Sequence, residues 1–244
     1  MTEIPPLSTV RDRLTGGAVL ACIGDRASGR SVTRIAEVLA RGLGARVLLA
    51  TVQQPGLIRR GLEQATGVRV TVGEPSERLL ELAERERAQL IVVAAPREST
   101  ARTPLLGNVH LALAGAASCP VVIVPPGVSA IPTDGPIVCG VDGSASSRAA
   151  AELAADLARR LDSHLLVVES ISAPPDRLIA VAERECAQVV VTASRGRGTT
   201  ASMLVGPIAS RLVLDAARPV LVVPERTSSA SSSSRSMVSR SSRI

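Results

Sequence analysis

The apolar residues of this chain come in short runs that alternate with stretches of helical periodicity. The N-terminal part has four runs of Val, Leu and Ile, at residues 19–23, 47–52, 90–94 and 121–124. Such nearly continuous apolar runs are typical of parallel strands covered by helices on both faces. A fifth segment, Val68–Val72, alternates apolar with polar residues and predicts a half-exposed edge strand.

The C-terminal part repeats this pattern with four apolar runs, at residues 137–141, 165–168, 189–192 and 220–223. Between the runs, apolar residues at helical spacing predict amphipathic helices. The clearest stripes are Val32, Ile35, Leu39 and Leu43, and then Leu153, Leu157 and Leu161. Prolines at 75 and at 174 or 175 suit the first turn of further helices. This alternation of strands and helices predicts βαβ units and parallel sheets.

The two parts are related copies. Residues 75–125 align without a gap on residues 174–224, and 20 of the 51 positions are identical. Further upstream, residues 30–52 align on residues 148–170 at a larger offset, so the second copy is 19 residues shorter between these blocks. The missing stretch contains the counterpart of Val68–Val72. The repeat therefore predicts two Rossmann-like, doubly wound α/β domains in tandem, of which the second lacks one edge strand.

The composition suggests how the chain is divided. We predict an N-terminal extension (1–16), a first domain (17–125), a Pro- and Gly-rich linker (126–136), a second domain (137–224) and a Ser/Arg tail (225–244). The last strand of each domain is wholly apolar and would favour aggregation if it were an exposed edge. We therefore expect residues 121–124 and 220–223 to pair or pack about a pseudo-twofold axis, as in an intramolecular dimer.

Charge and composition exclude several classes of protein. The net charge is +6, and the tail contributes half of it with four arginines, one glutamate and ten serines. No aromatic residue is present to stack on the bases of a single-stranded nucleic acid, so we expect no specific nucleic-acid partner. No apolar run approaches the length of a membrane span, and the N-terminus does not resemble a signal peptide. We therefore expect a cytoplasmic protein without a membrane partner.

The four cysteines and two histidines do not form a metal-binding pattern. Cys22, Cys119, Cys139 and Cys186 stand far apart, without a Cys-x-x-Cys pair. We expect no metal site, and we expect the cysteines to be small buried residues, because free cysteine is most often buried.

Candidate binding residues follow the strands of the second copy. In an open parallel sheet, ligands bind beyond the carboxyl ends of the strands. Asp142 follows the first strand there, the loop 193–198 follows the third, and Gly206 precedes a helix. A glycine-containing loop that leads into a helix N-terminus can hold a phosphate with its N–H groups.

At these residues the chain resembles the universal stress protein family, from residue 17 to residue 224. The segment VDGSASSRAAAELAADLARRL from Val141 is similar to the family's first strand and helix, and TASRGRGTTASMLVGPIASRLVLDAARPVLVVP from Thr192 is similar to its closing block. The resemblance implies an adenine nucleotide alpha hydrolase-like fold that pairs through its last strand, in a homo-oligomer or in tandem. Some members bind ATP with Gly-x-x-Gly, nine residues, and then Gly followed by Ser or Thr.

The second copy keeps part of that motif. Gly196 and Gly206 match, whereas Ala193 replaces the first glycine and Pro207 replaces the Ser or Thr. Asp142 matches the family's adenine-contacting aspartate. Arg195 flanks the loop, as does Arg197, and could meet a phosphate. The resemblance thus implies weak ATP binding, by the second copy alone.

The first copy departs further from the motif. Its residues at the four motif positions are Ala94, Arg97, Gly107 and Asn108, and Gly24 stands opposite Asp142. We interpret this site as lost. Each matching residue of the second copy also has a structural explanation: Asp142 can form a strand-to-helix turn, Gly206 a bend and Pro207 a helix start.

Two functions remain open from the sequence. The first is a stress-response or signalling protein whose second copy binds an adenine nucleotide weakly. The alternative is an interaction protein that binds no nucleotide and acts through the surface of the paired copies. An enzyme would need a positioned base or metal-binding carboxylates near the phosphates. The sequence shows no such cluster, so we expect a binding protein and not an enzyme.

The tail gives a first testable prediction. A segment so rich in serine and arginine cannot bury enough apolar surface to order itself. Deleting residues 227–244 should therefore change the melting temperature by no more than about 1 °C in a circular dichroism melt. Polyanion affinity should fall, because half of the net charge is lost. A clear drop in melting temperature would show that the tail packs on the folded part.

Overall fold

The computed structural model describes residues 17–24, 26–53, 68–96, 109–169, 175–195 and 205–225. Two predictions made above lie outside these residues: the position of Gly196 in the candidate loop, and the behaviour of the tail beyond Glu225. Arg97, Gly107, Asn108 and Arg197 also lie outside them.

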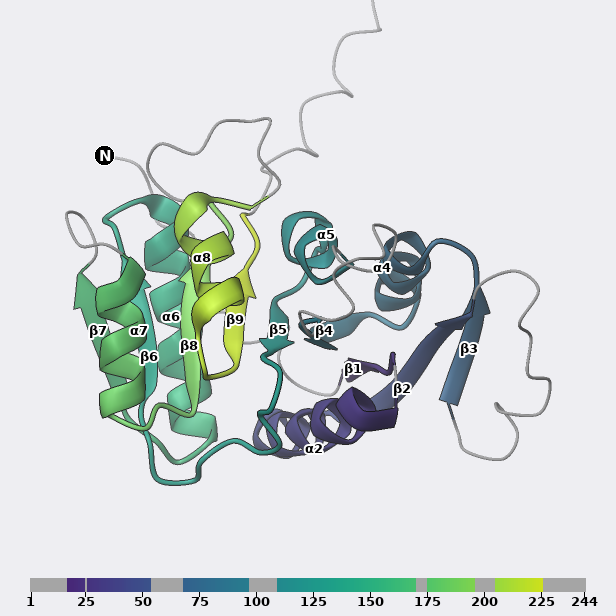
Figure 1. Ribbon diagram of the computed structural model, residues 1–244, viewed down its shortest axis with the longest axis horizontal. Coiled ribbons are helices and arrows are strands. Elements are labelled where there is room, and N and C mark those ends of the chain that lie inside the picture. Colours follow the sequence, from purple (N-terminus) through teal and green to yellow (C-terminus); the bar gives the residue numbers. More distant parts are fainter. Residues whose placement is uncertain are drawn as a thin grey trace, which may run out of the picture.

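One mixed sheet runs through the whole described structure (Figure 1). The first copy supplies β1 (Ala18–Cys22), β2 (Arg46–Gln53), β3 (Val68–Val72), β4 (Ala88–Ala94) and β5 (Val121–Val124). The second copy supplies β6 (Ile137–Val141), β7 (Leu165–Glu169), β8 (Val189–Ala193) and β9 (Val220–Val223). These nine strands lie in the order β3-β2-β1-β4-β5-β9-β8-β6-β7. Every neighbouring pair is parallel except β5 and β9.

The predicted fold is confirmed, including the shortened second copy. β1 and β2 pair with Val19 opposite Val47, and β6 and β7 pair in the same register with Ile137 opposite Leu165. β3 pairs with β2 as the edge strand of the first copy. Among the described residues of the second copy, no strand takes the corresponding place beside β7.

Helices cover both faces of the sheet. They are α2 (Arg26–Leu43), α4 (Pro75–Arg85), α5 (Val109–Ala116), α6 (Ala145–Arg160), α7 (Pro175–Arg184) and α8 (Pro207–Asp215). The buried side chains of α2 and α6 pack in one core, and those of α4, α5, α7 and α8 pack in the other. In the first copy, Figure 1 shows α2 and the pair α4 and α5 on opposite sides of the strands.

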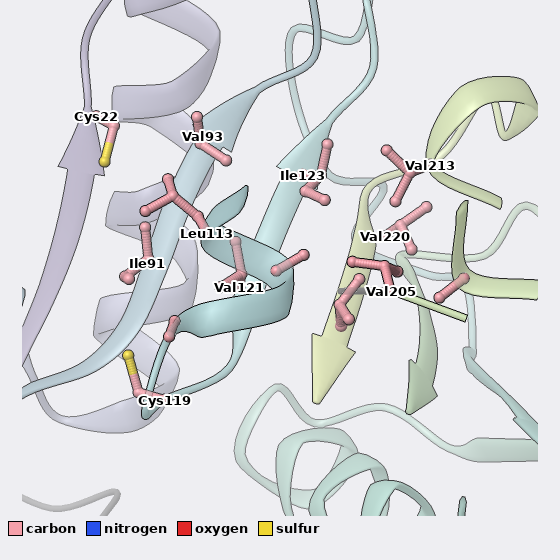
Figure 2. Packing of buried hydrophobic residues seen from close by; sticks show 14 of the residues in the cluster. Cys22, Ile91, Val93, Leu113, Cys119, Val121, Ile123, Val205, Val213 and Val220 are labelled. Atoms are coloured by element: carbon pink, nitrogen blue, oxygen red, sulfur yellow. The ribbon is translucent and has the colours of Figure 1, made fainter. Parts of the chain in front are cut away.

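The two copies join through the pairing of β5 with β9. The strands are antiparallel, with Val121 opposite Val222, Val122 opposite Leu221, and Ile123 opposite Val220. Their side chains alternate between the two cores, so each core extends across both copies. Figure 2 shows Val121 and Ile123 in the same cluster as Val220. The expected pairing of the last strands is confirmed.

Helices from the two copies also meet on one face of the sheet. Gly42, near the end of α2, lies against Leu161, the residue that caps the end of α6. A Cβ atom at Gly42 would be 2.5 Å from Leu161 Cδ2 and 3.2 Å from the carbonyl oxygen of Arg160. The absence of a side chain at Gly42 therefore permits this close contact.

The linker is bound closely to the second copy. The Nε2 of Gln188 donates a hydrogen bond to the carbonyl of Thr133 (3.0 Å), and Ser163 Oγ donates one to the carbonyl of Gly135 (2.8 Å). A Cβ atom at Gly135 would collide with the carbonyl oxygen of Cys186. The segment is therefore a packed connector with fixed contacts.

The cysteine prediction is wrong at one position. Cys22, Cys119 and Cys139 are buried, but Cys186 is exposed. Cys186 follows the end of α7 and has a φ of 50°. It occupies the left-handed position at which the chain leaves a helix, as does its counterpart Arg87 with a φ of 51°. This position faces solvent, whatever residue occupies it.

The contact between α2 and α6 can be tested by a double-mutant cycle. Replacing a helical glycine by alanine normally stabilises a protein by about 0.5 to 1 kcal/mol. We expect Gly42→Ala to destabilise this protein by about 1 kcal/mol instead, because its Cβ would overpack Leu161. In a Leu161→Ala background, Gly42→Ala should destabilise the protein less than in the wild type. We expect a coupling energy of at least about 0.5 kcal/mol from denaturant melts. A stabilising Gly42→Ala would contradict this contact.

Candidate functional site

The described candidate site residues of the second copy lie at one edge of the sheet. β6 and β8 are parallel, and Cys139 lies opposite Val191. The carboxyl ends of these strands, at Val141 and Ala193, are therefore at the same level. Asp142 follows the first end and Ser194 follows the second.

Asp142 is held in a tight turn between β6 and α6. The residue is only 7% exposed, and Oδ1 accepts a hydrogen bond from the N–H of Ser144 (2.9 Å). Gly143 has a φ of 77°, a conformation that favours glycine. Ser144 then caps α6 by accepting from the N–H of Ser147 (3.0 Å). The turn role considered for Asp142 is thus present, and it fixes the position of the carboxylate.

Ser194 connects three segments at this edge. Its N–H donates to the carbonyl of Val223 (2.7 Å), and its carbonyl accepts from the N–H of Gly206 (2.7 Å). Its hydroxyl oxygen accepts from the N–H of Glu225 (3.1 Å). The sequence reasoning missed this residue. Its counterpart in the first copy is Ala95, so the replacement of alanine by serine was the available signal.

The N-terminus of α8 lies beside the end of β8 because of the bond between Gly206 and Ser194. Gly206 is the N-cap residue, with φ −69° and ψ 162°, and no side chain caps the helix there. Any residue can adopt this conformation, so the backbone does not require a glycine at this position. Pro207 is the first helical residue. The first-turn N–H groups of Ile208 and Ala209 have no acceptor within the helix.

Arg195 follows Ser194 at this edge. Its Nη1 lies 3.5 Å from Glu225 Oε2, in an ion pair that is largely open to solvent. The structure therefore brings Asp142, Ala193, Gly206 and Pro207 to one edge, with Arg195 next to them and paired. Such exposed ion pairs contribute little to stability, so a ligand could displace Glu225 at small cost.

The corresponding helix of the first copy carries a buried histidine. His110 lies in α5, where α8 has Ala209, and the residue is 3% exposed. Among the described residues, its Nε2 atom has no hydrogen-bond partner. Burial lowers the pKa of His110 to about 4, so the side chain is neutral at pH 7.

The described residues offer no place for a metal ion, since no three of their His, Cys, Asp and Glu side chains are grouped suitably. Burial raises the pKa of Cys119 and of Cys139 to about 12, so neither thiol ionises near neutral pH.

No helix in the described ranges is long and apolar enough to cross a membrane.

Comparison with known proteins places the chain in a family. The model of the universal stress protein family matches residues 56–125 and 168–224, which together make up more than half of the chain. The chain belongs to the universal stress protein family. The resemblance found in the sequence is thereby confirmed, and membership supports a role in the stress response.

Two curated universal stress proteins of Mycobacterium tuberculosis, Rv2623 and MT2698, are each 31% identical to this chain over 167 residues. Each match covers 50% of this chain and 56% of the relative. The chain thus spans about half the length of the curated relatives it matches.

Solved structures support the fold. A universal stress protein from Archaeoglobus fulgidus has a TM-score of 0.63 at 15% identity, with 86% of this chain and 97% of that chain covered. A functionally unknown protein from Pseudomonas aeruginosa has a TM-score of 0.64 at 17% identity, with 89% and 94% covered. At this level of identity the likeness shows the two-copy α/β architecture and nothing of the ligand.

The buried histidine makes a specific contribution to acid sensitivity. An unfolded chain protonates His110 near pH 6.5, whereas the folded protein protonates it near pH 4. The unfolded state therefore binds the proton first, and stability falls as the pH drops through this window, by up to about 3 kcal/mol.

His110→Gln should remove this contribution while retaining a polar side chain of similar size. We expect the difference in unfolding free energy between the wild type and the variant, measured in denaturant melts, to change between pH 7 and pH 4. Carboxylate protonation affects both proteins alike and cancels in the comparison. A pH-independent difference would contradict the buried neutral histidine.

Proposed function

We propose that this universal stress protein binds an adenine nucleotide weakly through its second copy, with the first copy as a structural partner. One observation carries the proposal: the hydrogen bond from Gly206 to Ser194 joins the start of α8 to the end of β8, beside the turn of Asp142. A fixed carboxylate and an uncapped helix N-terminus therefore lie at one edge of the sheet.

The residues of this edge suit different parts of a nucleotide. The carboxylate of Asp142 can accept a hydrogen bond from the amino group of adenine. The first-turn N–H groups of α8 and the guanidinium of Arg195 favour the negative charge of phosphates. Gly196, outside the described residues, would let the backbone approach a phosphate.

Two features make the site weak. Pro207 has neither a hydroxyl nor a backbone N–H to donate to a phosphate. The N–H of Gly206 already donates to Ser194 and is not available to a ligand. Because a hydrogen bond to a charged group contributes roughly 1.5 to 3 kcal/mol, each missing donor lowers affinity substantially.

We propose binding without catalysis, and a location in the cytoplasm. Transfer or hydrolysis of a phosphoryl group would need a positioned base or a metal-binding carboxylate pair. In the proposed arrangement Asp142 contacts the adenine base, so it would not act on the phosphates. An assay for phosphate release from Mg-ATP tests this part of the proposal directly.

The alternative is an interaction protein that needs no nucleotide. Two contacts favour it: Asp142 Oδ1 accepts from Ser144, and Arg195 pairs with Glu225. In this case both residues serve the local structure, and the surface of the paired copies carries the function.

Calorimetric titration with Mg-ATP distinguishes these functions. Pro207→Ser restores a hydroxyl and an N–H, and we expect it to tighten binding by about 10- to 100-fold. Asp142→Ala should abolish binding in both backgrounds. Calorimetry suits this chain because it has no tyrosine or tryptophan to report binding by fluorescence.

Ser144→Ala is the matched control for Asp142→Ala. It removes the cap of α6, at a cost of about 0.5 to 2 kcal/mol in stability, but leaves the carboxylate in place. Ser144→Ala should therefore lower the melting temperature without abolishing ATP binding. If Pro207→Ser binds no ATP, the interaction function is the correct one. Micromolar binding that survives Asp142→Ala would show that the nucleotide lies elsewhere.

A further inference from the structure

The sheet ends at an unusually apolar edge strand, β7. It pairs with β6, and no other described strand lies beside it (Figure 1). Its counterpart β2 is covered by β3, and Leu49 of β2 lies opposite Val68. By the repeat, Val167 occupies the place of Leu49 in the second copy. Without a covering strand, Val167 is 47% exposed.

The two free edges of the sheet differ in their protection. β3, at the other end, carries the exposed and charged Arg69 as its second residue. A charge on an edge strand discourages pairing with other chains. β7 has the sequence Leu165, Leu166, Val167, Val168, with its first charge at Glu169. The β7 edge therefore lacks the feature that blocks pairing at the β3 edge.

We propose that two copies of this chain associate through β7, whose strands pair antiparallel about a twofold axis and extend the sheet from one molecule into the next. Such a contact is self-complementary and closes after two molecules, unlike a contact between β7 and β3, which would continue as a filament. The chain already contains a junction of this kind, because equivalent strands of its two copies pair antiparallel at β5 and β9.

The residues of β7 suit this register. With Val167 on the axis, the two exposed valines pack against each other on the same face of the sheet. Leu166 then lies opposite Val168 of the second molecule, and Glu169 lies opposite Leu165. The two carboxylates of Glu169 stay apart, near opposite ends of the junction. No like charges meet across it.

Sedimentation velocity of the full chain tests the proposal. We expect the wild type to sediment as a dimer at micromolar concentration. Val167→Arg places two guanidinium groups together on the axis and should weaken dimerisation at least about tenfold. Val167→Ile keeps an apolar β-branched side chain and should retain the dimer.

Matched controls come from the other exposed apolar side chains. Val72 of β3 is 41% exposed and Leu214 of α8 is 70% exposed. Val72→Arg and Leu214→Arg make the same change of charge elsewhere, and both should leave the dimer intact. A dimer that dissociates with either control and persists with Val167→Arg would overturn the proposal.

Amide hydrogen exchange tests the proposal on the wild type. Its result therefore does not depend on whether Val167→Arg folds correctly. The amides of β7 should become more protected as the protein concentration rises through the dimer dissociation constant. A monomer at all concentrations overturns the proposal. Protected β7 amides in that monomer would show that a segment of the same chain covers the edge, and unprotected ones would show that the edge is free.

Discussion

The antiparallel pairing of β5 with β9 is the contact on which the other features of this protein depend. Each of these strands is wholly apolar and faces a core on both sides, so neither copy could leave it at an edge. Fully burying a Val, Leu or Ile side chain stabilises a protein by about 1.5 to 3 kcal/mol, and the junction buries several of them. Because both cores cross it, the two copies support each other.

This mutual support explains why the copies can differ. In the described part of the second copy no strand takes the place of β3, yet β8 and β9 remain inside the sheet. The first copy has Gly24 where the second has Asp142, and His110 where the second has Ala209. Loss of a binding residue in one copy does not weaken the shared core. The site of the second copy also depends on the junction, because Ser194 is bonded to the end of β9.

The fold was predictable from the sequence because it depends on repeated apolar patterns. β3, β5, β6 and β9 begin and end where the apolar runs predict. β4 begins at Ala88, two residues before its apolar run, because the polar Gln89 is buried within the strand. α8 ends at Asp215, since Ala216 is already extended.

The contacts of the candidate site were less accessible to such reasoning. The role of Ser194 depends on bonds to two other segments, at Gly206 and at Val223 and Glu225, which no local pattern records. The ion pair of Arg195 with Glu225 likewise joins residues 30 positions apart. Conversely, the exposure of Cys186 follows from a left-handed helix end, which overrides the general tendency of cysteine to be buried.

The start of α8 differs from the other helix starts whose caps are defined, and this difference bears on its role. Glu74 caps α4 by accepting from the N–H of Glu77 (2.9 Å), and Ser144 caps α6 in the same way. Gly206 offers α8 no side chain, although its conformation would accommodate the serine or aspartate preferred at this position. Such a residue would satisfy the first-turn N–H groups internally. Because glycine leaves them without a side-chain acceptor, the helix start keeps its capacity to bind an external anion, which is the capacity that a phosphate site requires.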